Sequence, residues 1–189
     1  DRRITYLRVS VTDRCNLRCV YCMPLEGVKW QDHNSIMRYE EIEKIIRVAA
    51  EEGIREVRLT GGEPLVRKNI QELIRLISAI KGIEDISLTT NGILLTDQAE
   101  ELKKAGLNRI NISLDTMDPE KYAKITRGGN IQRVFDGLEK AEAVGLDPIK
   151  LNMVLLKGVN DGEILELASL SRQHNWQIRF IELMPVGNT

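Results

Sequence analysis

The sequence lacks any large excess of charge and any long apolar run. Its 189 residues include 27 Lys and Arg against 28 Asp and Glu, a formal net charge of -1. This balance gives no global attraction to nucleic acid or an anionic membrane, so neither is expected as a partner. No apolar stretch approaches the roughly 20 residues that span a bilayer, and the opening residues do not resemble a signal peptide. We expect a cytoplasmic protein with one domain over residues 1–189.

Cysteine is scarce and confined to one place. The chain has three cysteines, all in the segment CNLRCVYC, and none after Cys22. An odd number of cysteines within one short loop is a poor framework for disulfides. The spacing C-x3-C-x2-C therefore indicates metal ligation or redox chemistry at Cys15, Cys19 and Cys22.

Short β-branched runs alternate with amphipathic stretches along the whole chain. The expected strands are 4–11, 56–59, 85–89, 109–114, 148–155 and 177–183. The expected helices are 39–52, 69–80, 96–105, 119–144 with a break near 128–129, and 161–173. Strands joined by helical crossovers pair in parallel with right-handed connections. The pattern predicts an α/β fold, a partial (β/α)6 TIM-like barrel whose chemistry lies in loops at the carboxyl ends of the strands.

Thiolates are soft ligands that suit zinc or an iron-sulfur cluster. A cube of four irons with three protein ligands leaves one iron free to bind something else. A structural zinc site would need a fourth ligand, and neither His33 nor His174 stands at a familiar spacing. A 4Fe-4S cluster on Cys15, Cys19 and Cys22 is thus favoured, with zinc as the alternative.

The cysteine spacing after a first strand resembles the signature of the radical S-adenosylmethionine (SAM) superfamily. The flanks, TDRCNLRCVYCMP, resemble the GTP 3',8-cyclases that begin molybdenum cofactor synthesis. The resemblance implies that SAM is cleaved reductively at the cluster and that the 5'-deoxyadenosyl radical starts GTP cyclisation, a lyase reaction. It also implies an electron donor, and as a candidate partner the next enzyme of the molybdopterin pathway.

The resemblance implies a set of SAM contacts around the cysteines. Gly62, in the run TGGEP after the second strand, matches the segment that binds the methionine ammonium group. Tyr21 matches the aromatic residue beside the adenosine, and Ser113 matches a further SAM contact. Met184, after the last strand, matches the methionine that borders the adenine. Ordinary turn, loop or core packing is the alternative for each.

Basic residues interrupt four apolar strands, at Arg8, Arg58, Lys150 and Arg179. A buried charge without a partner costs several kcal/mol, roughly, so each needs an anion or a path to solvent. Alternation places Arg8, Arg58 and Lys150 in phase with polar residues, and the four basic residues together predict binding of a triphosphate. The resemblance implies the same, because cyclases have basic residues at these positions around GTP. It also implies that Thr89 touches the nucleotide.

The sequence departs from the family in having no cysteine after Cys22. Complete cyclases carry three further cysteines in a C-terminal portion, for a second 4Fe-4S cluster. We therefore expect a truncated core with impaired turnover, and exposed apolar surface that favours self-association, for example as a homodimer. The alternatives are another radical SAM enzyme that modifies a peptide or a heme, and a non-catalytic iron-sulfur or metal-binding scaffold.

Overall fold

The computed structural model describes residues 3–184, which form one six-stranded parallel sheet. The strands are β1 (Tyr6–Ser10), β2 (Glu56–Thr60), β3 (Asp85–Thr90), β4 (Arg109–Ser113), β5 (Ile149–Leu155) and β6 (Trp176–Glu182). Their order in the sheet is their order in the chain, so each strand pairs with the one that precedes it. The predicted partial (β/α)6 barrel is confirmed, with β1 and β6 as its two open edges.

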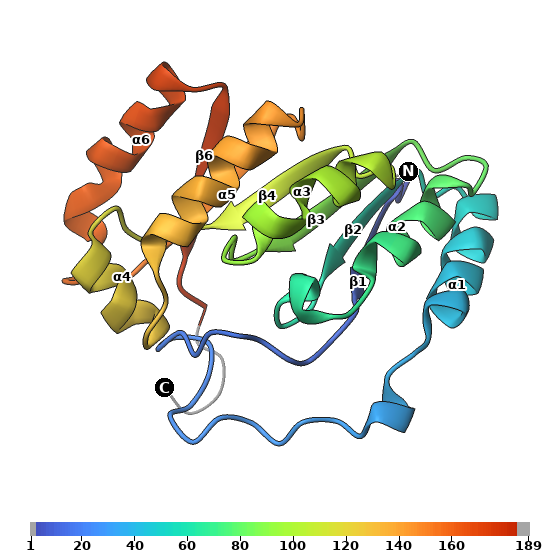
Figure 1. Cartoon of the computed structure of the whole chain (residues 1–189), viewed down its shortest axis with the longest axis horizontal. Helices are drawn as coiled ribbons and strands as arrows, with labels where there is room; N and C mark the ends of the chain where they lie inside the picture. The colour runs from blue at the N-terminus through green and yellow to red at the C-terminus, as the bar shows by residue number, and fades with distance from the viewer. Residues whose placement is uncertain (1–2, 185–189) are drawn as a thin grey trace.

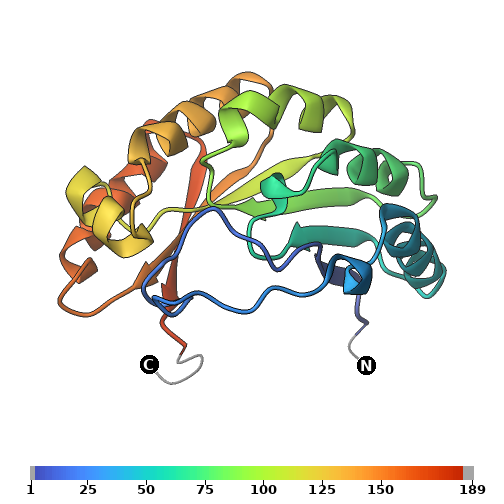
Figure 2. The same cartoon turned by 60° about the horizontal axis from the view of Figure 1, so that its bottom comes forward.

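Six α-helices connect the strands. They are α1 (Tyr39–Glu51), α2 (Ile70–Ser78), α3 (Leu95–Lys104), α4 (Pro119–Thr126), α5 (Ile131–Ala143) and α6 (Ile164–Gln173). Figure 1 shows the helices beside the strands, and Figure 2 shows them arching over the convex face of the sheet. The long segment between β1 and α1 crosses the hollow on the other side (Figure 2). Within residues 3–184, no helix has both the length and the apolarity to cross a bilayer.

The helical stretch predicted over 119–144 is two helices, with the break where glycines were expected to interrupt it. Arg127 and Gly128 both have positive φ, 56° and 112°, which ends α4. The side chain of Asp118 accepts a bond from the N–H of Lys121 and so caps α4. Asn130 caps α5 in the same way. Capping of this kind stabilises a helix by about 1 kcal/mol.

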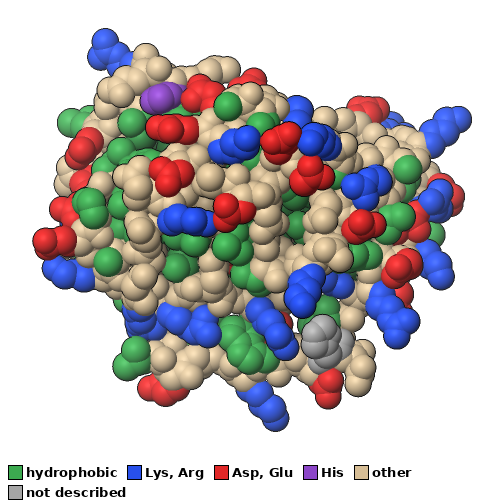
Figure 3. All heavy atoms as spheres, in the orientation of Figure 1, with side chains coloured by type: hydrophobic (Ala, Val, Ile, Leu, Met, Phe, Trp, Pro, Cys, Tyr) green, Lys and Arg blue, Asp and Glu red, His purple; other side chains and the backbone are tan. Residues whose placement is uncertain are grey.

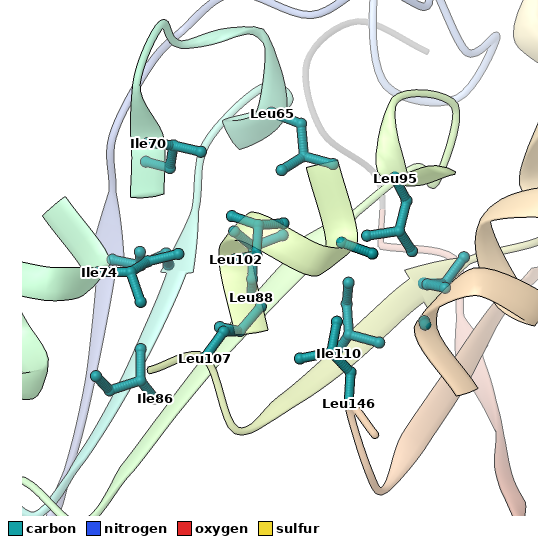
Figure 4. Packing of buried hydrophobic residues seen from close by; sticks show 14 of the residues in the cluster. Leu65, Ile70, Ile74, Ile86, Leu88, Leu95, Leu102, Leu107, Ile110 and Leu146 are labelled. Atoms are coloured by element: carbon teal, nitrogen blue, oxygen red, sulfur yellow. The ribbon is translucent and has the colours of Figure 1, made fainter. Parts of the chain in front are cut away.

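The core lies between the sheet and the helices. In β2, Val57 and Leu59 face the helices and are fully buried, whereas Arg58 between them is only half-buried. Figure 4 shows side chains of β3 and β4, such as Leu88 and Ile110, in one buried cluster with Leu102 of α3. Burial of one such side chain contributes about 1.5–3 kcal/mol. Period-two alternation therefore assigns the other face of each strand to the hollow.

We call this concave face of the sheet the lumenal face. Its members include Arg8, Arg58, Ser87, Thr89, Arg109, Asn111, Ser113, Lys150, Asn152 and Arg179. Strand register pairs Arg8 with Arg58, Arg58 with Ser87, and Asn152 with Arg179. The four cations that interrupt the apolar strands thus share one face.

Candidate active site

The cysteine loop follows β1 at the carboxyl end of the sheet. Backbone hydrogen bonds fix it to the end of α4, from the N–H of Arg18 to Thr126 (3.2 Å) and from the N–H of Val20 to Ile125 (2.9 Å). The guanidinium of Arg18 donates to the carbonyl of Cys15 at 2.8 Å. The loop is therefore anchored to an element more than one hundred residues further along the chain.

The three thiols are close enough to influence one another. Burial, followed by the nearby Asp115 carboxylate and the other two thiols, raises the pKa of Cys19 to about 12. Burial also raises the pKa of Cys15, with Glu63 and Cys22 adding to the effect. A multiply charged cationic centre offsets such repulsion between thiolates. The donor set thus fits a metal cluster.

Hydrogen bonds to sulfur add to this fit. The Cys15 Sγ accepts from the N–H of Leu17 at 3.4 Å and from the Asn91 amide at 3.9 Å. Donors to ligand sulfur tune iron-sulfur centres. Among the described residues, no three His, Cys, Asp or Glu side chains gather as ligands of a single ion. A cube binds each thiolate at a different iron, so its ligands need not converge in that way.

The Gly61–Gly62 turn after β2 packs directly on the start of the cysteine loop. The Gly62 N–H donates to the carbonyl of Thr12 at 2.7 Å. A Cβ on Gly62 would lie 2.3 Å from the carbonyl oxygen of Arg14, and one on Gly61 would lie 2.4 Å from that of Thr12. Both neighbouring atoms are backbone, so only glycine allows this approach.

Glu63 joins the same turn to the end of β3. Its buried carboxylate accepts from the N–H of Leu65 (3.0 Å), the hydroxyl of Thr90 (2.7 Å) and the N–H of Asn91 (2.6 Å). Burial raises the pKa of Glu63, and these three bonds oppose that rise. Both oxygens of Glu63 thus accept hydrogen bonds from the protein itself.

The other residues predicted to contact SAM lie at or after the carboxyl ends of the strands. The Tyr21 hydroxyl donates to the Asp115 carboxylate, and burial raises the pKa of both groups. Ser113 ends β4 on the lumenal face, opposite Asn152. Met184 follows β6 and is 71% exposed. Tyr21, Gly62 and Ser113 are thus on three elements that meet at the carboxyl end of the sheet.

The lumenal cations form one electrostatic group. Partial burial lowers the pKa of Arg58, and Arg109, Arg179 and Arg8 lower it further, against the opposing effect of Tyr6. Burial, then Arg179, Arg109 and Arg58, lowers the pKa of Lys150. Arg58 of β2 therefore lies within electrostatic range of Arg179 of β6, because the sheet curves. Basic side chains also gather along the lower part of the face in Figure 3.

Two features of this site were missed in the sequence. Arg109, the first residue of β4, is a fifth lumenal cation, and it forms ion pairs with Glu56 and Asp85. The Asn91 side chain reaches the cysteine loop, where its amide donates to the Sγ of Cys15 at 3.9 Å. The period-two alternation of β4 indicates that Arg109 is lumenal, since it is in phase with Asn111 and Ser113. The reach of Asn91 depends on the curvature of the sheet, which sequence does not give.

A family model for the radical SAM superfamily matches residues 9–171. The chain therefore belongs to the radical SAM superfamily. The match contains the three cysteines, the glycine turn and strands β2 to β5, so the site described above lies almost entirely within it.

This radical SAM chain is also similar to curated bacterial proteins. It is 54% identical over 189 residues to the GTP 3',8-cyclase of Pelotomaculum thermopropionicum, covering 100% of this chain and 58% of that protein. It is 58% identical over 187 residues to the GTP 3',8-cyclase of Moorella thermoacetica, covering 99% and 58%. The chain thus spans little more than half the length of these relatives.

Solved structures show the same fold at low sequence identity. Streptococcus suis SuiB, bound to its precursor peptide SuiA, has a TM-score of 0.79 and 21% identity, over 95% of this chain and 39% of that one. Methylornithine synthase, PylB, has a TM-score of 0.74 and 19% identity, over 95% and 53%. These likenesses confirm the partial barrel of the radical SAM fold.

Proposed function

We propose that residues 1–189 are the core domain of a GTP 3',8-cyclase that binds one 4Fe-4S cluster, SAM and GTP. The observation that carries the proposal is the set of lumenal cations, Arg8, Arg58, Lys150 and Arg179. Within residues 3–184, none of the four has an acidic side chain within ion-pair distance. Similarity to cyclases over the whole chain supports the same substrate.

In this proposal Cys15, Cys19 and Cys22 ligate the cluster. The bound cluster, once reduced, supplies the electron that cleaves SAM. Tyr21, Gly62, Ser113 and Met184 line the SAM site, and the close packing of Gly62 on Arg14 keeps the cysteine loop against the glycine turn. The chain's own part is to hold SAM beside the cluster and above the lumenal face.

GTP enters from the carboxyl end of the sheet, with its triphosphate toward the cations. Arg58 and Lys150 approach it from interior strands, and Arg8 and Arg179 from the two edge strands. Thr89, lumenal in β3, contacts the nucleotide. Guanidinium forks and an ammonium group are good phosphate ligands. A reductant is required, and the product passes to the next enzyme of molybdopterin synthesis. These 189 residues hold no cysteines for a second cluster.

The test starts from the anaerobically reconstituted chain. Iron and sulfide analysis should give a 4Fe-4S cluster, and dithionite with SAM should yield 5'-deoxyadenosine. Calorimetry should show GTP binding that weakens about 10-fold in Arg58→Gln and in Lys150→Gln. The exposed Lys81→Gln is the control and should bind like wild type. A loaded cluster without GTP binding would indicate another radical SAM reaction, and zinc in place of iron would indicate a metal-binding scaffold.

A further inference from the structure

Three charged side chains close the amino end of the lumenal face. Glu56, Asp85 and Arg109 are the first residues of β2, β3 and β4. Arg109 Nε donates to Asp85 Oδ1 at 2.9 Å, its Nη2 lies 2.7 Å from Asp85 Oδ2, and Nη2 lies 3.3 Å from Glu56 Oε2. The side chain of Arg109 is only 12% exposed. The ion cluster therefore lies at the far end of the hollow from the cysteine loop.

The cluster belongs to the same electrostatic group as the four predicted cations. The charge of Arg109 acts on both Arg58 and Lys150, and Asp85 acts on Lys150 with the opposite sign. On the lumenal face of the six strands, Glu56 and Asp85 are the two acidic residues, against five basic ones; Glu182 of β6 is in phase with the opposite face. The negative charge of the lumenal face is thus concentrated at its amino end.

Arg109 itself is not available to a ligand. Two of its nitrogens bind the carboxylates, and the third, Nη1, is buried without a hydrogen-bond partner among the described residues. A phosphate chain that enters from the carboxyl end therefore first meets cations that have no acidic partner within residues 3–184, and meets the carboxylates last. Like charges repel over several ångströms where water is partly excluded.

We propose that Glu56, Asp85 and Arg109 form a depth stop, which sets how far a polyphosphate enters the hollow and so how many phosphates the site accepts. This rests on the proposed nucleotide site. Arg109 neutralises one of the two carboxylate charges, and the remaining negative charge limits the approach of the terminal phosphate. The depth stop is a specificity device, since a monophosphate would not reach it.

The two signs of charge in the cluster give opposite predictions. Asp85→Asn keeps an oxygen that can accept from Arg109 but removes a negative charge, so GTP should bind about 3- to 10-fold more tightly. Arg109→Gln leaves two carboxylates without a counter-charge, so GTP should bind at least about 10-fold more weakly. Both changes in affinity should be smaller for GDP than for GTP, and less than about 2-fold for GMP.

The experiment is calorimetric titration of the reconstituted chain with GTP, GDP, GMP and inorganic tripolyphosphate at fixed ionic strength. Asp97→Asn is the matched control, because it removes the same negative charge from a 2.7 Å pair, with Arg133, on the helical layer. Tighter GTP and tripolyphosphate binding in Asp85→Asn alone supports the depth stop. A folded Asp85→Asn protein with unchanged or weaker binding overturns it, and the cluster is then only a structural ion pair. Absence of GTP binding in the wild type rejects the nucleotide site and the depth stop together.

Discussion

The hydroxyl of Tyr21 donates a 2.7 Å hydrogen bond to the carboxylate of Asp115, which lies 94 residues further along the chain. The other oxygen of Asp115 accepts from the N–H of Val154 at 2.8 Å. Asp115 is only 4% exposed, so this carboxylate ties the cysteine loop to β5 in a site with little water. The bond is therefore a direct link between the cysteine loop and the barrel.

Removal of that link should destabilise the protein. Tyr21→Phe leaves one oxygen of a buried carboxylate with no donor, which costs about 1–3 kcal/mol. Chemical unfolding of the apo chain, followed by circular dichroism, measures this directly. Tyr122→Phe is the control, since the Tyr122 hydroxyl is buried and has no partner within residues 3–184. Removal of the Tyr122 hydroxyl should leave the free energy of unfolding unchanged or raise it. An equal loss of stability in both variants would contradict the assigned role of the Tyr21 bond.

The glycine turn should be intolerant of a single methyl group. In Gly62→Ala the new Cβ meets the Arg14 carbonyl at 2.3 Å, and relief requires movement of the backbone that carries Cys15. We expect a loss of about 3 kcal/mol or more, with poor retention of iron and sulfide after reconstitution. In Gly162→Ala no described atom lies within 4 Å of the new Cβ, so iron content and stability should stay at wild-type values. Full cluster loading in Gly62→Ala would show that the turn can shift.

The buried carboxylate of Glu63 should not be replaceable by an amide. Glu63→Gln directs an N–H group at one or more of the donors from Leu65, Thr90 and Asn91. The unpaired groups should lower the free energy of unfolding by about 1–3 kcal/mol. The exposed Glu139→Gln, in the middle of α5, should change it by less than about 0.5 kcal/mol. A difference between the two variants that is close to zero would mean that water replaces the lost bonds.

Neutralisation of a lumenal cation should affect stability and binding in opposite directions. Burial and repulsion by Arg179, Arg109 and Arg58 disfavour the charge of Lys150, and attraction to Asp85 only partly offsets them. Lys150→Met should therefore stabilise the apo protein by up to about 1 kcal/mol while it weakens GTP binding. Thermal unfolding with and without GTP measures both effects, and Lys81→Met serves as the exposed control. A Lys150→Met protein that is less stable and binds GTP normally would assign Lys150 to packing.

Much of the fold was predictable because it depends on periodicity. Apolar alternation placed Arg58 and Lys150 on one face, and the glycines near 128 divided α4 from α5 as expected. These features follow from the conformation of a few neighbouring residues. The carboxyl-end position of the cysteine loop followed from the parallel topology alone.

The side-chain contacts of the site were not predictable in this way. The bonds from Tyr21 to Asp115 and from Asn91 to Cys15 join residues 94 and 76 positions apart. Each depends on the curvature and stagger of the sheet, which set the distance between non-adjacent loops. Arg109 was visible by its phase, but its pairing with Asp85 required the register of β3 against β4.

The anchoring of the cysteine loop has a consequence for biosynthesis. The cysteines leave the ribosome early, yet the N–H groups of Arg18 and Val20 find their partners at Thr126 and Ile125. Until α4 has been made and docked, these groups have no partner, and the loop has no fixed shape in which to receive a metal. The first residues of the site to be translated thus reach their final backbone contacts only after most of the domain has been made.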